Sequence, residues 1–160
     1  MVENLRLPEF YSGPPRAMAD YVLQSRLLCW LIRCRFPTLV EQAGLEEVCG
    51  VVQALAPKWL ILLFFDAATL EVTLLIWDFF FCHGGDVSLV FAVLAVVQHG
   101  QTTFCSNPDA YSDIGLLEVL QESGTSMAAS DFSAALETVL SAGPQPVVLP
   151  TTASLLQQKL

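Results

Sequence analysis

The sequence is poor in charged residues, above all in cations. Only 14% of its 160 residues are charged, against a typical ~25%, and no Lys or Arg lies between Lys58 and Lys159. The net charge is −9. Nucleic-acid binding needs clustered cations that displace counterions, and anionic membrane surfaces attract basic segments. The composition therefore argues against both kinds of partner, whereas a basic protein partner is compatible with it but not required.

Motifs for metal, nucleotide or nucleophilic chemistry are also missing. The sequence has no CxxC pair, HExxH, GxSxG, P-loop or GxGxxG pattern. Cysteine and histidine can bind zinc, and the sequence contains Cys82, His83, His99 and Cys105. No two of these residues have the usual ligand spacing, so they do not predict a zinc site. We therefore predict no catalytic residue, no metal site and no cofactor.

The cysteines do not form a disulfide pattern. They are Cys29, Cys34, Cys49, Cys82 and Cys105. Their number is odd, their spacing is wide and their surroundings are apolar, which predicts reduced, buried thiols of a cytosolic protein.

Long uninterrupted apolar runs are missing too, although 54% of the residues are apolar. A membrane-spanning helix needs roughly 20 apolar residues, but the best window is interrupted by Asp66, Glu71 and Asp78. The N-terminus has no basic-then-apolar signal pattern. We predict no integral membrane segment. The apolar excess instead predicts helices buried on more than one side, or a partner that covers one face.

Apolar residues recur at helical spacing, which predicts an all-α fold with an irregular array of about seven helices. We expect an irregular lead-in at 1–15, a helical domain at 16–141, and a proline-containing linker with a frayed tail at 142–160. The predicted helices span, in order, 16–35, 38–42, 45–55, 58–65, 70–82, about 86–100, 108–122 and 128–140. Asp66 or Thr69 is expected to cap the fifth, and Gly100 and Gly124 to end or separate helices.

A few polar residues stand out in this apolar sequence. Asp78 lies between Trp77 and three phenylalanines, where a charge should find a donor or shift its pKa. An ion pair or a cap that joins two helices is favoured over a catalytic role. His83 and His99 lie at predicted helix ends, where imidazoles commonly interact with terminal carbonyls.

Three consecutive apolar segments, taken in order, resemble a known family. Residues 57–64 (PKWLILLF) correspond to a "P-W-F-L-x-L-F" segment and residues 75–80 (LIWDFF) to "R-I-W-D-x-F-L". Residues 84–97 correspond to "G-x-x-x-L-F-x-x-A-L-A-L-L", and 36–42 (FPTLVEQ) to "x-P-x-L-x-x-H-L". Together they resemble the TBC domain, the all-helical activator of Rab-type small GTPases. The family-motif residues are Pro37, Pro57, Trp59, Trp77, Asp78 and Phe91.

The resemblance covers roughly residues 9–100, and more weakly the helices to about 140. It implies the C-terminal lobe of a TBC domain, a role in regulating GTPases of vesicle traffic, and a location in the cytoplasm or at the periphery of endomembranes. The family stimulates hydrolysis with an arginine and a glutamine from "I-x-x-D-x-x-R" and "Y-x-Q-G" motifs, and neither motif occurs here. Arg16 and Arg26 have different surroundings, and Leu75 stands where the family has the arginine beside Asp78.

Three classes of function follow from these observations. The first is a Rab-GTPase regulator without activity on its own, because the two motifs that carry the family's catalytic arginine and glutamine, its catalytic fingers, are missing. The second is a non-catalytic helical scaffold or adaptor that binds a partner protein through its apolar face; a membrane-associated helical protein is a third, less favoured reading. In each case we expect Trp59, Trp77, Phe80 and Phe91 in the core, with Trp77→Ala costing ~3–5 kcal/mol.

Overall fold

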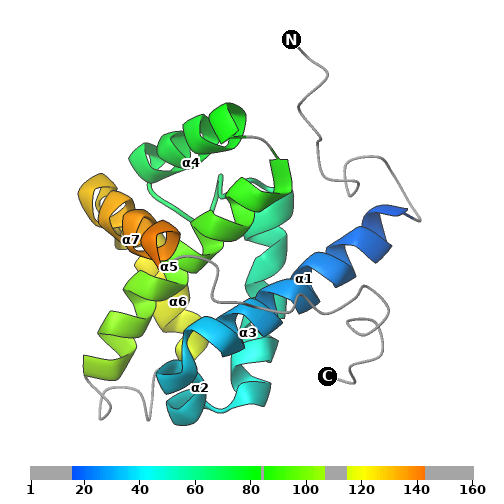
Figure 1. Cartoon of the computed structure of the whole chain (residues 1–160), viewed down its shortest axis with the longest axis vertical. Helices are drawn as coiled ribbons and strands as arrows, with labels where there is room; N and C mark the ends of the chain where they lie inside the picture. Colours follow the sequence, from blue (N-terminus) through cyan, green and yellow to red (C-terminus); the bar gives the residue numbers. More distant parts are fainter. Residues whose placement is uncertain (1–15, 84, 107–114, 143–160) are drawn as a thin grey trace.

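The computed structural model describes residues 16–83, 85–106 and 115–142, which form seven α-helices and one π-helical turn (Figure 1). The elements are α1 (Arg16–Arg35), α2 (Pro37–Ala43), α3 (Leu45–Ala56), η2 (Pro57–Ile61), α4 (Leu70–His83), α5 (Gly85–Ser106), α6 (Leu116–Ser126) and α7 (Ala129–Ser141). The predicted all-α class is confirmed. The predicted lead-in at 1–15 and the tail from residue 143 onward lie outside the described residues.

Helix α5 is the centre of the array. It packs against α1, α2, α4, α6, α7 and η2, and Figure 1 shows it crossing the molecule between α7 and α1. Every residue from Leu89 to Val97 except Phe91 is buried. An α-helix surrounded in this way needs apolar side chains on all its faces, which explains why this segment reads as one continuous apolar run.

By length and composition alone, one helix in the described part of the chain could cross a membrane. It is the segment Val87–Ser106 within α5, and 61% of its most apolar window is buried inside the fold.

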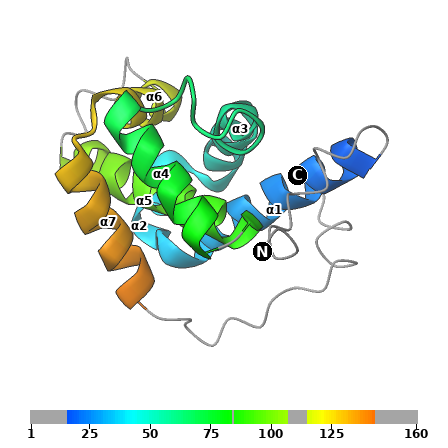
Figure 2. The same ribbon diagram turned by 90° about the horizontal axis from the view of Figure 1, so that it is seen from above.

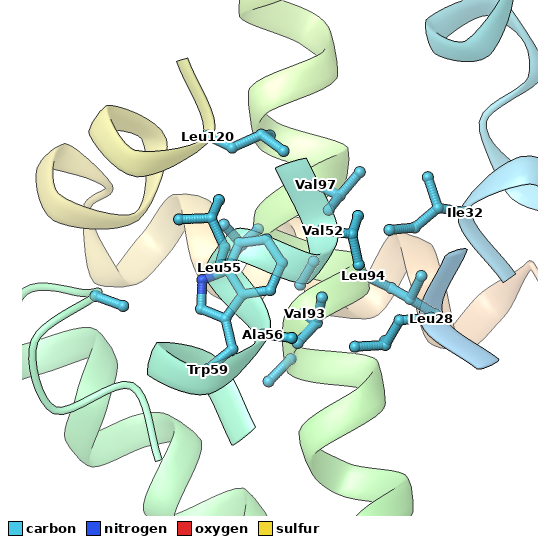
Figure 3. Close-up of a cluster of buried hydrophobic side chains, with 14 of the residues drawn as sticks. Leu28, Ile32, Val52, Leu55, Ala56, Trp59, Val93, Leu94, Val97 and Leu120 are labelled. Carbon is cyan, nitrogen blue, oxygen red and sulfur yellow. The ribbon is translucent and has the colours of Figure 1, made fainter. Parts of the chain in front are cut away.

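Side chains from five elements meet at the core (Figure 3). The labelled members are Leu28, Ile32, Val52, Leu55, Ala56, Trp59, Val93, Leu94, Val97 and Leu120. Two hydrogen bonds hold α1 over this core. The Tyr21 hydroxyl donates to the Gln53 carbonyl of α3 at 3.0 Å, and the Arg35 guanidinium donates to the Val139 carbonyl of α7 at 2.7 Å.

Two of the four predicted core aromatics are buried and two are not. Trp59 and Phe80 are each only 1% exposed, as expected. Trp77 and Phe91 are half-buried and pack against the core rather than within it, so their predicted place in the core is wrong. The reason is that α4 and α5 are apolar on nearly every face, and such a sequence does not indicate which face turns outward.

The segment after Trp59 also departs from the prediction of a helix to Phe65. The π-helical turn ends at Ile61, and the Leu62 amide donates to the Pro57 carbonyl at 3.1 Å. Leu63 and Phe64 then adopt left-handed φ angles of 49° and 64°. This conformation costs about 1–2 kcal/mol per residue, and it is offset by the complete burial of Phe64, whose ring stacks near Trp59 at 6.3 Å between centroids.

Thr69 is the cap of α4, whereas Asp66 is not. The Thr69 hydroxyl accepts a hydrogen bond from the Val72 amide at 3.3 Å, and its carbonyl accepts one from the Thr73 amide at 2.8 Å. The same hydroxyl donates to the Met127 carbonyl at 3.4 Å, which ties the start of α4 to the α6–α7 connection.

Two glycines that were predicted to end or separate helices lie inside them. A Cβ at Gly100 would sit 2.5 Å from the Leu120 side chain, and one at Gly124 would collide with the Ala67 carbonyl oxygen. These glycines therefore allow close packing between elements rather than ending a helix. Consequently α5 continues to Ser106, and His99 lies inside it rather than at its end.

Helix α6 begins later than predicted. Its N-cap Gly115 is extended, with φ −62° and ψ 160°. The predicted start at Pro108 lies outside the described residues.

The first prediction concerns Gly124. Gly124→Ala should lower the free energy of unfolding by about 1–3 kcal/mol, because the new methyl group meets a backbone oxygen that cannot rotate away. Gly50→Ala is the matched control: it lies in α3 with no atom within 4 Å of the added Cβ, and should stabilise by about 0.5–1 kcal/mol. Urea unfolding followed by circular dichroism measures both; a Gly124→Ala variant as stable as the parent would contradict the packing described here.

The second prediction separates the two motif tryptophans. Trp59→Ala should cost about 3–5 kcal/mol, because it empties a buried site. Trp77→Ala should cost clearly less than Trp59→Ala, and Trp77→Phe about 1 kcal/mol for the lost indole hydrogen bond. Equal destabilisation by the two alanine variants in the same urea assay would show that Trp77 is a core residue after all.

Candidate functional site

The family-motif residues do not gather in one cleft. Pro37 is exposed at the start of α2, Pro57 is half-buried at the start of η2, and Phe91 is half-buried on α5. The structure does bring the segments of Trp59 and Trp77 together, on either side of the turn at 62–64. The two tryptophan-containing segments of the motif therefore form one local structural unit, which consists of η2, the turn and α4.

Two side chains of α4 hold this turn. The Trp77 indole N–H donates to the Leu63 carbonyl at 2.8 Å. One helical turn earlier, the buried Thr73 hydroxyl donates to the Phe64 carbonyl at 3.3 Å. Both carbonyls belong to the left-handed residues. The Phe64 carbonyl also accepts a hydrogen bond from the Ala67 amide at 3.0 Å, so α4 and the turn itself together satisfy the acceptors of this unusual conformation.

Asp78 is exposed on α4, and this corrects the expectation of a charge enclosed by aromatic rings. Its aromatic neighbours in the sequence point elsewhere: Phe80 is buried and Phe79 is half-buried. Water can solvate the carboxylate, so the fold does not require an ion pair or a cap from it. His83, at the end of α4, places Nδ1 3.3 Å from the Phe79 carbonyl, as expected for an imidazole at a helix terminus.

An exposed apolar surface covers the outer side of α4. It consists of Leu70, Leu74 and Phe81 on the helix, which are 73%, 49% and 59% exposed, with half-buried Trp77 between the last two. The preceding loop adds Leu62 and Phe65, the latter 72% exposed. We call these six residues the α4 surface. Figures 1 and 2 show α4 at the periphery of the array.

The sequence predicts an apolar face for a partner protein but not its location on α4, although α4 carries a signal for it. Val72, Ile76 and Phe80 recur every four residues and are buried. A second apolar stripe, Leu70, Leu74, Trp77 and Phe81, follows at helical spacing on another face. Two apolar stripes on one short helix indicate one contact inside the fold and a further apolar face outside it.

A small pocket lies close to the same unit. Its lining residues are Leu55, Lys58, Trp59, Asp66, Ala67, Gln121 and Thr125, from α3, η2, the following loop and α6. The polar groups among them are an amine, a carboxylate, an amide and a hydroxyl, and this set contains no imidazole or thiol that could act as a base or nucleophile at neutral pH.

The family model of the Rab-GTPase-TBC domain matches residues 1–104. The chain belongs to the TBC family. The matched region contains all six family-motif residues and ends within α5.

Curated relatives agree with this assignment. The chain is 32% identical over 94 residues to "Growth hormone-regulated TBC protein 1" of Rattus norvegicus and equally similar to the protein of that name from Mus musculus. The aligned part is 58% of this chain but only 30% of the rat protein and 24% of the mouse protein. No solved structure matches the chain.

The cysteines of this TBC chain are all unpaired, but only one of them is fully buried. Cys34 and Cys82 are exposed, and Cys49 and Cys105 are half-buried, so the prediction of five buried thiols is wrong. Cys29 is buried, and its thiol donates to the Cys49 carbonyl at 3.8 Å. Among the described ranges, no three His, Cys, Asp or Glu side chains are grouped to hold a metal ion.

Burial raises the pKa of the Cys29 thiol from its ordinary 9.0 to about 12, and the nearby Cys49 thiol adds to this shift. The thiolate is the nucleophilic form of cysteine, so Cys29 stays inert at neutral pH. In an unfolded chain the thiol ionises near its ordinary value. Stability contributed by this group is therefore present below pH 9 and is lost as the pH rises towards 12.

The third prediction follows from these environments. At pH 8.5, iodoacetamide should modify Cys34 and Cys82 within minutes, while Cys29 reacts only at the rate of unfolding. Peptide mass spectrometry of the labelled chain measures this, with urea-unfolded protein as the control in which all sites react. Modification of Cys29 as fast as Cys34 in the native chain would contradict the burial of α1 against α3.

Proposed function

We propose that this chain regulates Rab-type small GTPases of vesicle traffic by binding them, without stimulating GTP hydrolysis on its own. Membership of the TBC family supports the GTPase as partner. The observation that carries the proposal is that the 160 residues contain neither the "I-x-x-D-x-x-R" nor the "Y-x-Q-G" motif that the family uses as fingers. Such an arginine finger contributes about 10³–10⁵ in rate, so its loss removes most of the activation.

The surroundings of the "I-W-D" segment support the same reading. Where the family has an arginine, this chain has half-buried Leu75, while Asp78 is exposed. The pocket beside Trp59 contains Lys58 but no arginine. A lysine presents a point charge rather than the planar fork that suits a developing phosphate charge, so it is a poor substitute for a finger. We further propose a location in the cytoplasm or at the periphery of endomembranes, as the resemblance to the family implies.

The second candidate function is that of a non-catalytic scaffold. It is favoured by the α4 surface, since apolar side chains this exposed on one helix and its preceding loop are typical of protein interaction sites. The two functions are compatible, because the scaffold reading requires no contact with a nucleotide.

The fourth prediction tests the proposed function. GTP hydrolysis by a panel of purified Rab proteins should stay within about two-fold of its intrinsic rate when the chain is added in excess, against ~10³–10⁵-fold for a domain with an arginine finger. A TBC protein that contains both fingers is the positive control. Binding is measured in parallel by calorimetry with Rab proteins loaded with a non-hydrolysable GTP analogue.

The outcomes separate the candidates. Binding without acceleration supports the proposed regulator. Acceleration of ten-fold or more would overturn it, and Arg16→Ala and Arg26→Ala variants would then identify the residue responsible. A folded, monodisperse chain that neither binds nor accelerates any Rab would favour the scaffold function.

A further inference from the structure

We propose that the α4 surface is a docking site for a basic amphipathic helix of another protein. The inference stands apart from the proposed GTPase function, because it uses a different property of the chain, namely the pattern of exposed residues on α4. It rests on three features of this helix: the spacing of its exposed apolar residues, the position of its acids, and the shortage of cations around them.

The spacing fits a helical partner. Leu70, Leu74, Trp77 and Phe81 are separated by four, three and four residues. This alternation is that of the a and d positions along which two helices pack side by side. The stripe extends over twelve residues, whose first and last Cα atoms are about 16 Å apart at ~1.5 Å rise per residue, so that a partner of three turns covers it.

The two aromatic side chains of this stripe are held in place. The Trp77 indole is fixed by its hydrogen bond to the Leu63 carbonyl. The Phe81 ring contacts buried Phe80 edge to face, with centroids 5.3 Å apart and an angle of 77°. Both aromatic side chains thus lose little conformational freedom when a partner binds.

The acids define the charge of the partner. With Leu74 and Phe81 at a positions and Leu70 and Trp77 at d positions, Glu71 and Asp78 both fall at e positions, beside the seam. Both are exposed. Residues at e positions pair with charged side chains of the facing helix, so two acids two turns apart select Lys or Arg on the partner.

The same acids argue against two other occupants. In a second copy packed antiparallel, the e positions of the two helices meet, and Glu71 and Asp78 would face like charges. An anionic membrane would repel them as well, and no Lys or Arg lies between residues 59 and 158 to offset this. The charge pattern therefore favours a cationic helix over both.

The test uses two synthetic three-heptad peptides against the full chain. Both have Leu at a and d; one has Lys at all e and g positions and the other has Glu. Fluorescence anisotropy of the labelled peptide should show binding of the Lys peptide that is at least about ten-fold tighter than that of the Glu peptide, and that weakens as the salt is raised.

Variants of the chain locate the site. Leu74→Gln combined with Phe81→Gln should weaken binding of the Lys peptide at least about ten-fold, since it removes the centre and one end of the seam. Leu45→Gln, a substitution of an exposed leucine on α3, is the matched control and should leave binding of the Lys peptide unchanged.

A second pair of variants tests the charges. Glu71→Gln with Asp78→Asn should abolish the preference for the Lys peptide over the Glu peptide. Glu41→Gln with Glu118→Gln changes the net charge equally and should preserve this preference.

Each remaining outcome overturns the proposal. These are equal binding of the two peptides, binding of neither, or binding that survives Leu74→Gln with Phe81→Gln. Sedimentation that shows a dimer lost in the same double variant would identify a second copy as the occupant. Co-sedimentation with phosphatidylserine vesicles that depends on Leu74 and Phe81 would identify a membrane. None of these results depends on whether the chain binds a Rab protein.

Discussion

The burial of α5 is the constraint on which the rest of the structure depends. Its segment from Leu89 to Val97 is enclosed by neighbours from both halves of the chain, and α1, α2, α4, α6, α7 and η2 all contact this helix. Each of those elements buries part of its apolar surface against α5, while α1, α2 and η2 also pack against α3. Buried apolar surface contributes about 25 cal/mol per Å², so this shared contact stabilises several elements at once. The glycines at 100 and 124 serve the same packing, since they let α6 approach α5 and the loop at Ala67.

The unit that lies at the edge of this core explains the motif by which the family is recognised. Trp59 is a core residue, whereas Trp77 stabilises the turn that follows Trp59 through a hydrogen bond to the Leu63 carbonyl. The left-handed residues Leu63 and Phe64 need both the buried Phe64 ring and the hydrogen bonds from α4. Two tryptophans at this spacing therefore belong to one local structure. That structure also fixes the orientation of α4, and so presents its second apolar stripe to the outside.

Helix content was largely readable from the sequence, because periodicity and proline positions are local signals. Helix α1 has its predicted bounds, and α2, α3, α4 and α7 differ from the prediction by no more than one residue at either end. The predictions of helix ends and of exposed faces failed where contacts between distant segments determine them. Gly100 and Gly124 are tolerated inside helices because another element approaches them, which no local pattern indicates. Likewise, which apolar face of α4 points outward depends on α5 and α7, so neither the partial exposure of Trp77 nor the α4 surface was predicted. The family itself was predictable, since it depends on ordered motifs rather than on contacts.

The most direct test of this account is hydrogen–deuterium exchange of the purified chain in buffer without detergent, followed by mass spectrometry. If α5 is the enclosed centre of a folded array, amides from Ala92 to Val97 should exchange slowest in the chain, at the rate of global unfolding, and those of the turn at 62–68 much faster. Fast exchange of Ala92–Val97 in buffer, with protection gained only in detergent micelles, would contradict the account, because α5 would then require a lipid-like environment rather than the helices that surround it.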